Sequence, residues 1–361
     1  MNDKNLLSMQ IDLSKFNDLS KIDKSYFDKL TNEEKQNVEE IPKQISFYKD
    51  AFIKIKNNPL AILSIILLSL VIILILVGIF INPYKYNEII TINGIRDVTA
   101  QDLKPFEYSL NELEEIKNGA KIFPHIFGTD SICRDYFARV AIGSAISLFI
   151  GIFASILVLI IGLIYGSISG YLGGKVDLIM MRICDIIYSL PDMLIIILLS
   201  VILNPLLSNN LTGIFADLGV NIISLLIVFA LLYWVSIARL VRGQILSIRK
   251  NEYIEACKLI GTPVPRIIKT HIIPNCMSII FIATTLQIPS AIFTESFLSF
   301  VGLGVQIPLS SLGSLANDAR TSMSLYPYKM IIPALLIAML VLSFNLLGDA
   351  FRDAFDPKLK K

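Results

Sequence analysis

The chain has 361 residues, of which 54% are hydrophobic and only 17% charged, and its mean hydropathy is +0.66. This composition excludes a soluble fold and indicates an integral membrane protein. The formal net charge of +2 carries no nucleic-acid signal, because the basic residues cluster beside apolar runs instead of forming one face. The four cysteines lack CxxC spacing, so they predict neither a disulfide framework nor a metal site.

The N-terminal part is polar and has no early apolar region, so we expect no cleaved signal peptide. Residues 1–43 hold Lys and Asp/Glu in near balance, which predicts a polar cytoplasmic extension. Residues 44–58 place apolar side chains at helical spacing among lysines, which predicts an amphipathic interfacial helix; an ordinary polar tail is the alternative. Residues 59–81 are uncharged over the ~20 residues that cross a bilayer, and the basic residues before them place their start in the cytoplasm.

Residues 82–138 are polar and follow the first span, so they are expected to form an extracytoplasmic loop. Their lysines and arginines do not overturn this prediction, because long loops are translocated largely regardless of charge. Near the end of the loop the sequence reads HIFGTD from His125 to Asp130, followed by Arg134-Asp135 and Arg139. We single out Asp130 as a pathway or structural candidate.

The second apolar span, at about 141–166, has small residues at a spacing of four. They are Gly143, Ser147, Gly151 and Ser155, followed by Gly162, Gly166 and Gly170. Small residues at this spacing let helix backbones approach closely in lipid, so we expect this helix to be central in the bundle. Residues 171–175 fail the GxxxxGK[ST] spacing and are interpreted as a cytoplasmic turn. Because no nucleotide-hydrolysing motif is found, any ATP would be hydrolysed by another chain.

The third and fourth spans flank a short outside loop. The third, at about 184–203, contains Pro191 and Asp192, which predicts a kinked helix. The loop, residues 204–218, carries no Lys or Arg. The fourth span, at about 220–240, returns the chain to the cytoplasm, with Trp234 as an interface aromatic.

Residues 245–275 form the polar segment between the fourth and fifth spans. From Arg242 to Asn275 there are six basic and two acidic residues, and the positive-inside rule places this loop in the cytoplasm. Residues 251–260 lack Gly and Pro and repeat apolar side chains at helical spacing, which predicts a short amphipathic helix. Gly261 then suits a left-handed helix end, Thr262-Pro263 suits the cap and first residue of a second helix, and Pro274-Asn275 closes it. The alternative is a basic connector without a function of its own.

This loop resembles the EAA loop of ABC importer permease subunits, where it is the coupling helix that seats in a groove of the ATPase subunit. Cys257 replaces an Ala of the family pattern and Ile273 replaces a Leu, and both keep a small or apolar side chain. The motif at residues 125–139 resembles the signature of the oligopeptide/dipeptide permeases of the "C" type. The resemblance implies these ATPase-coupling residues: Glu255, Ala256, Cys257, Gly261, His271, Pro274 and Asn275.

The fifth span, at about 277–300, carries Glu295 near its outer end, in a stretch that matches the family pattern. An acid inside a membrane is costly, so Glu295 is either a structural hydrogen-bond partner or a pathway residue. Residues 302–329, rich in Gly, Ser and Pro, resemble the re-entrant scoop region of these permeases. The sixth span, at about 330–347, runs into a family-like tail in which Asn345 and Asp349 are further pathway or structural candidates.

The resemblance covers about residues 46–358 and implies an all-α integral membrane protein with six transmembrane helices in the type I ABC importer permease architecture. It implies a five-helix transport core over residues 139–351, a cytoplasmic tail over 352–361, and both termini in the cytoplasm of a bacterial cell. The implied partners are a homologous "B" type permease, two ATP-binding subunits, an extracellular solute-binding protein and membrane lipids, with no nucleic acid. The chain would be a non-catalytic transport subunit that binds no cofactor or metal, with ATP and Mg²⁺ held by partner subunits.

The family implies import of short peptides, that is, dipeptides and oligopeptides, while relatives that carry nickel or another small solute leave the cargo open. An ion-coupled secondary transporter is the alternative from another class, and it would need an inverted repeat and membrane-buried charges. We find no such repeat, and the first, second and fourth spans lack central charges. A membrane anchor or sensor would leave the coupling loop unexplained.

Overall fold

A computed structural model describes residues 47–92, 94–208 and 219–355, and the contacts below lie within the compact unit Tyr48–Lys361. The expected extension 1–43, most of the expected loop 204–218 and the end of the expected tail lie outside the described residues. The helices before the first break are α2 (Phe47–Asn57), α3 (Pro59–Leu76), the π-helix η4 (Val77–Ile81), the 3-10 helix η5 (Val98–Ala100), α4 (Leu110–Lys117), α5 (Tyr136–Leu172), α6 (Gly174–Tyr188) and α7 (Asp192–Ser208).

The remaining helices are α9 (Val220–Leu232), α10 (Trp234–Ile248), α11 (Glu252–Leu259), α12 (Val264–Ile267), the π-helix η6 (Ile268–Ile272), α13 (Ile273–Val301), α14 (Leu312–Ala319) and α15 (Tyr328–Phe355). Two short strands, β1 (Thr91–Ile92) and β2 (Ile95–Arg96), pair antiparallel with Thr91 opposite Arg96. The fold is therefore almost entirely helical, as the sequence predicted.

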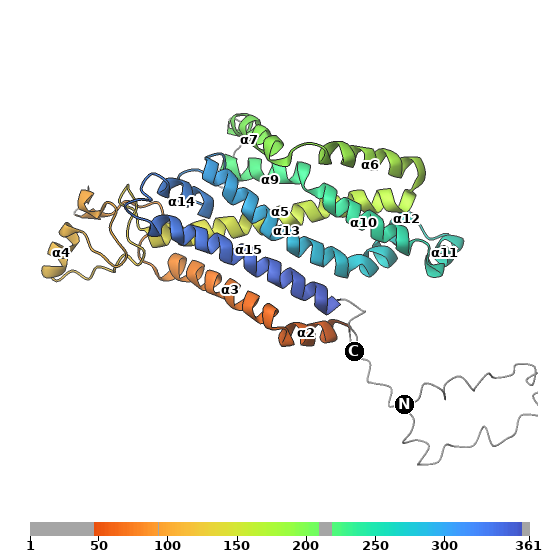
Figure 1. Cartoon of the computed structure of the whole chain (residues 1–361), viewed down its shortest axis with the longest axis horizontal. Helices are drawn as coiled ribbons and strands as arrows, with labels where there is room; N and C mark the ends of the chain where they lie inside the picture. The colour runs from red at the N-terminus through yellow and green to blue at the C-terminus, as the bar shows by residue number, and fades with distance from the viewer. Residues whose placement is uncertain (1–46, 93, 209–218, 356–361) are drawn as a thin grey trace, which may run out of the picture. The chain divides into compact units, whose positions relative to one another are not determined.

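Helix α5 lies in the middle of the bundle, where it contacts α9, α10, α13 and α14 (Figure 1). Gly162, Gly166 and Gly170 face α10, and a methyl group added at Gly166 would lie only 2.5 Å from the carbonyl oxygen of Ala238. Gly151 faces Ile292 of α13 in the same way. The small-residue ridge thus lets two neighbouring helices approach the α5 backbone, and the predicted central position of this helix is confirmed.

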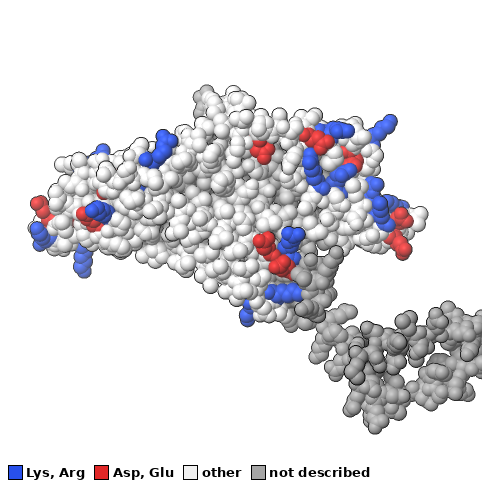
Figure 2. Space-filling view, in the orientation of Figure 1, with Lys and Arg blue, Asp and Glu red and all other residues white. Residues whose placement is uncertain are grey.

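Five continuous helical stretches in the described residues are long and apolar enough to span a membrane. They are Pro59–Ile81, Tyr136–Leu172, Val220–Ile248, Val264–Val301 and Tyr328–Phe355. A sixth span requires the pair α6 and α7 to be counted as one. In Figure 2, Lys, Arg, Asp and Glu gather around α4 at one end of these helices and around α6 and α11 at the other, and the surface over their middle is mostly uncharged.

The third span differs from its prediction. The helix does break next to Pro191, but α6 and α7 meet at an angle of 85°, which is far more than the kink that was expected. Proline removes a backbone donor and disfavours helix in the residue before it, so a break at this position follows from the sequence. The size of the bend does not, because it depends on what the two halves pack against. Residues 204–208, expected in a loop, belong to α7.

Four spans also extend further than expected, because a helix does not end where its residues become polar if those residues find partners. The fifth span begins at Val264 instead of about residue 277. The fourth span runs to Ile248 instead of about residue 240, and on this extension Arg242 donates two hydrogen bonds to Asp177 of α6, at 2.5 and 2.6 Å. The second span covers Tyr136–Leu172 and the sixth continues to Phe355.

Trp234, which the sequence suggested as an interface aromatic, has a side chain that packs inside the helical bundle. Its side chain is buried, its ring lies 4.4 Å from that of Tyr165 on α5, and its indole N–H donates to the carbonyl oxygen of Leu231 at 2.9 Å. This ring contact joins α10 to α5 and depends on a residue distant in the sequence.

Candidate functional site

The loop that resembles a coupling segment folds as two helices joined by a linker over residues 260–263, which is longer than the one-residue hinge expected from the sequence. Helix α11 ends at Leu259, and the amide of Thr262 donates to the carbonyl oxygen of Cys257 at 3.0 Å. Gly261 has φ +77° and nothing lies within 4 Å of the position of its missing Cβ. The glycine is therefore required by its left-handed backbone and not by crowding, as the sequence predicted.

The second helix differs from its prediction in two respects. Thr262 does not cap it: Pro263 is the N-cap residue of α12 and makes no side-chain cap bond. Pro274 does not close it, because α12 continues through η6 into α13, where Pro274 lies in the first turn. The wider hydrogen bonds of a π-helix, such as that from the amide of Ile273 to Ile268, shift the ladder so that the missing N–H of proline is tolerated.

The inner face of this segment is apolar and fully buried. Ile254 of α11, Ile267 of α12 and Ile272 of η6 are each 0% exposed and pack in one cluster with Ile245 and Cys276. This cluster connects α11 directly to α10 and α13. A movement of α11 would therefore be passed on to the two spans that flank it.

The apex of the segment is apolar and exposed. Leu259 is 88% exposed and Ile260 is 80% exposed, directly before the hinge at Gly261. Two large aliphatic side chains at a protruding apex, over a buried stem, are typical of a surface that another protein covers.

The base of the segment is tied to the end of α5 by polar contacts. A guanidinium N–H of Arg249 donates to the carbonyl oxygens of Gly170 and Tyr171, both at 3.1 Å. The ammonium of Lys258 lies 5.7 Å from the ring centroid of Tyr171. The two hydrogen bonds from Arg249 use carbonyls at the end of α5, which the helix itself leaves without a donor.

The predicted coupling residues divide by exposure. Glu255, Ala256, Gly261, Pro274 and Asn275 are exposed, whereas Cys257 and His271 are half-buried. The Asn275 side chain donates to the carbonyl oxygen of His271 at 2.6 Å and to the hydroxyl of Tyr253 at 3.3 Å, which ties the start of α13 to α11.

Glu295 lies elsewhere and is completely buried. Its carboxylate accepts hydrogen bonds from Ser147 of α5 at 2.8 Å and from Ser299 of α13 at 2.7 Å. The same serine oxygens accept the backbone amides of Leu312, at 3.2 Å, and Val305, at 3.0 Å. Glu295 thus organises the junction of α5, α13 and the start of α14, which favours the structural interpretation of this residue over the pathway one.

Asp130 is held in a buried ion cluster at the α4 end of the helices. Its carboxylate accepts from Arg134 at 2.7 Å and from Arg139 at 2.9 Å, and Arg139 also donates to Asp318 of α14 at 3.2 Å. Asn345 and Asp349, the other two candidates, are exposed on α15. The structure therefore does not bring the four pathway or structural candidates together.

A buried histidine cluster in the same region was not recognised as such from the sequence. His125 is 0% exposed, and its ring nitrogens face Asp135 at 2.9 Å and Glu112 at 3.0 Å. Burial lowers the pKa of His125, but hydrogen bonds to Asp135 and Glu112 and the charges of both outweigh burial and raise the pKa to about 9. The S-x-x-E pattern of Ser109 and Glu112, which forms a capping box on α4, is the signal that could have located Glu112.

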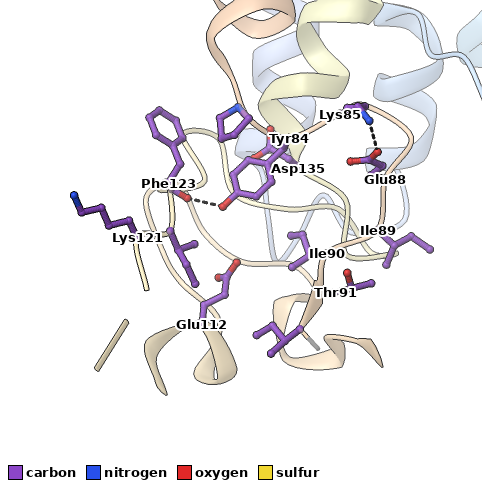
Figure 3. A pocket seen from close by; sticks show the side chains of 13 residues that line it. Tyr84, Lys85, Glu88, Ile89, Ile90, Thr91, Glu112, Lys121, Phe123 and Asp135 are labelled. Atoms are coloured by element: carbon purple, nitrogen blue, oxygen red, sulfur yellow. Dashed lines mark hydrogen bonds and ion pairs between the residues drawn. The ribbon is translucent and has the colours of Figure 1, made fainter. Parts of the chain in front are cut away.

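Figure 3 shows Tyr84, Glu112 and Asp135 around a cavity of about 510 Å³ beside this cluster. The Tyr84 hydroxyl donates to the carbonyl oxygen of Phe123 at 2.6 Å, and the Tyr84 ring lies 4.5 Å from the His125 ring. Burial, with the charges of Glu112 and Asp135 nearby, raises the pKa of Tyr84. The cavity wall is thus fixed by the same residues that hold the histidine.

Comparison with known proteins then defines the family. Residues 162–361 match the family described as "Binding-protein-dependent transport system inner membrane component", and residues 46–105 match the "N-terminal TM domain of oligopeptide transport permease C". The chain belongs to the oligopeptide/dipeptide permease family. Within this permease family it is 36% identical to the oligopeptide transport system permease protein OppC of Bacillus subtilis over 319 residues, which is 88% of this chain and 92% of that one.

Two further relatives of this permease have related names. The dipeptide transport system permease protein DppC of Bacillus subtilis is 36% identical over 318 residues, 88% of each chain. The oligopeptide transport system permease protein OppC of Escherichia coli K12 is 37% identical over 313 residues, 87% of this chain and 92% of that one. The family and its apolar helices make this permease an integral membrane protein.

Proposed function

We propose that this chain is the permease subunit of an ATP-binding cassette importer and forms half of a translocation pathway for short peptides. The names of its relatives, which are oligopeptide and dipeptide transport permeases, support this cargo. The other half of the pathway comes from a homologous permease of the "B" type. Two ATP-binding subunits bind ATP and Mg²⁺, an extracellular solute-binding protein delivers the peptide, and this chain itself catalyses no reaction.

The observation that carries the proposal is the construction of α11. Ile254 is fully buried against the spans, whereas Leu259 and Ile260 are exposed at the apex. In the proposed complex the apex seats on an ATP-binding subunit in the cytoplasm, and the excess of basic residues from Arg242 to Asn275 supports that orientation. Both termini then lie in the cytoplasm, and the α4 end faces outward.

The mechanism follows from how the segment is joined to the spans. When the ATP-binding subunits close, they move the apex, and the buried cluster around Ile254 and Ile267 passes this movement to α10 and α13. Gly261 keeps α11 and α12 in a fixed relation, because its backbone conformation is one that side chains with a Cβ rarely adopt. The chain contributes movement to transport and no chemical step.

The experiment compares two substitutions at Gly261 in proteoliposomes that contain both permeases and both ATP-binding subunits, with the solute-binding protein added. Gly261→Val should uncouple ATP hydrolysis from peptide uptake, because a β-branched residue cannot hold φ +77° without strain. Gly261→Asn is the matched control, since Asn tolerates this conformation, and it should keep most of the uptake. Unchanged uptake per ATP in Gly261→Val would contradict the proposal that this segment passes movement from the ATP-binding subunits to the spans.

Two measurements address the alternatives. Loss of uptake when the ATP-binding subunits are inactivated, with the ion gradient intact, excludes an ion-coupled carrier. Cross-linking from Cys257, which is half-buried on α11, should capture an ATP-binding subunit. Capture of no such neighbour would contradict the proposed seating of the apex.

A further inference from the structure

A second cavity, of about 250 Å³, lies among the helices away from the α11–α12 segment. Its wall is formed by the bend between α6 and α7, the junction of α9 and α10, and the middle of α13. The polar side chains among its lining residues are Tyr188, Asp192, Tyr233, Ser236, Gln287 and Ser290. Three of the surrounding elements belong to stretches long and apolar enough to span a membrane. Asp192, Ser236 and Ser290 are exposed in this chain, so the cavity is a polar recess that opens at the surface of an apolar bundle.

Several polar side chains that line this cavity do not form hydrogen bonds or ion pairs with one another. In the described part of the chain, no hydrogen bond or ion pair is formed by the side chains of Asp192, Gln287 or Ser290. Gln287 and Ser290 are three residues apart on α13 and so share one face of it. Inside a membrane, polar side chains of this kind face a partner or a water-filled path, because exposure to lipid is costly.

Asp192 supplies a negative charge that the cavity does not balance. Among the described residues that line the cavity it is the only charged one. Arg239, three residues after the lining residue Ser236 on α10, is engaged by Asp185 at 2.8 Å and by the ring of Tyr188, whose centroid is 4.7 Å away. Asp192 is also in the first turn of α7, where the helix dipole stabilises a negative charge. A cationic group of a ligand could therefore pair with the Asp192 carboxylate.

We propose that the cavity is a passage site for the transported peptide, in which Asp192 receives the α-ammonium group and Gln287 and Ser290 hydrogen-bond to peptide amides. This inference rests on the proposed function. A free peptide carries a positive amino end and a row of amide donors and acceptors, which match one carboxylate beside an amide and a hydroxyl. A lone divalent cation fits less well, because it needs several oxygen ligands or an imidazole, and the lining offers a single carboxylate.

The first test measures the charge of the cavity directly, in the complete transporter in proteoliposomes. Ser290→Cys is treated with a cationic and with an anionic methanethiosulfonate, and the parent chain reports the background of the four native cysteines. The cationic reagent should react about fivefold faster because of the nearby carboxylate. Adding Asp192→Asn should bring the two rates together. A cysteine that stays unreactive throughout the ATP cycle, or a ratio that Asp192→Asn leaves unchanged, would overturn the inference.

The second test measures transport and separates the two proposals. Asp192→Asn should lower the initial rate of trialanine uptake at least about fivefold at saturating binding protein, because the ammonium loses its partner. Asn is itself a favourable residue at a helix N-terminus, so this variant should leave the start of α7 stable. Asp192→Glu, which keeps the carboxylate, should restore part of the uptake rate. If the parent complex takes up no trialanine, the proposed function fails. If the parent transports and Asp192→Asn transports equally well, only the passage site fails.

One outcome would assign Asp192 a different partner. If Asp192 pairs with a basic residue of the second permease subunit, Asp192→Asn should reduce the amount of that subunit that copurifies with this chain. The passage site predicts unchanged copurification with reduced uptake. Reduced copurification would therefore contradict it.

Discussion

The two ends of the helical bundle bury different kinds of side chain. At the α4 end, residues 82–135 bury charged groups that satisfy one another, with His125 between two carboxylates and Asp130 between two arginines. At the other end, the α11–α12 segment buries isoleucines and leaves its charged residues and its apex exposed. A buried polar network fixes a shape by itself, whereas a buried apolar stem with an exposed apolar apex holds a surface ready for another protein. In the proposed complex, the apex of the second end is covered by an ATP-binding subunit.

The largest effect should come from breaking the charged cluster. Asp130→Ala leaves Arg134 and Arg139 buried without their shared carboxylate, and removing one member of a buried ion pair typically costs about 3–5 kcal/mol. We expect a large fall in the unfolding midpoint of the purified chain in detergent and a low yield. A midpoint equal to that of the parent would show that this end is not held by its ion pairs.

The histidine should make the stability of the α4 end depend on pH. The pKa of His125 is raised to about 9 in the folded chain, against an ordinary value of 6.5. Its stabilising contribution is therefore fully present below about pH 6.5 and is lost as the pH rises through about 9, with an upper limit of about 3 kcal/mol. The protection factors of the amides in residues 110–135, which compare each exchange rate with the intrinsic rate at the same pH, should fall over this window. His125→Gln, the control, should flatten the dependence, and an unchanged slope in that variant would contradict the assignment.

A smaller effect is expected at the other end, where two isoleucines of similar position in the sequence provide a matched pair. Ile254→Val removes a fully buried methylene from the stem and should lower the local stability of α11 by about 0.5–1.5 kcal/mol. Ile260→Val, 80% exposed in the parent, should stay within about 0.5 kcal/mol. Hydrogen exchange of residues 252–259 measures both. Equal effects would mean that the apex is packed and is not a free surface.

The smallest effect should come from the rim of the charged cluster. Asp318 pairs with Arg139 at 3.2 Å but its side chain is 49% exposed, and solvent screening limits such a pair to about 1 kcal/mol or less. Asp318→Asn should therefore shift the unfolding midpoint far less than Asp130→Ala, although both carboxylates contact the same arginine. A comparable shift would show that Arg139 depends on both partners and not mainly on the buried one.

Features that depend on neighbouring residues in the chain could be predicted from the sequence. The short helix before Gly261, the left-handed conformation of Gly261 and the break near Pro191 all follow from local backbone preferences, and each is found in the structure. The small residues of α5 also predicted a close helix contact, since their spacing places them on one face.

Features that depend on distant residues could not be predicted in this way. Glu295 accepts a hydrogen bond from Ser147, which lies 148 positions earlier in the chain, and nothing in either local sequence specifies that contact. The contact of Trp234 with Tyr165 of α5 could not be predicted for the same reason. The 85° bend at α6 and α7 and the buried charge of His125 likewise depend on packing between elements. The roles of the coupling and pathway residues remain predictions.

The continuity of the stretch Val264–Val301 has a geometric consequence. These 38 residues form one helical rod without an intervening loop, which at about 1.5 Å per residue measures about 57 Å. If such a rod tilts by about 5° around one end, the other end sweeps about 5 Å sideways, which is roughly the width of a strand of extended polypeptide. A small change of tilt at one end of the rod therefore becomes a displacement of several ångströms at the other end, by length alone.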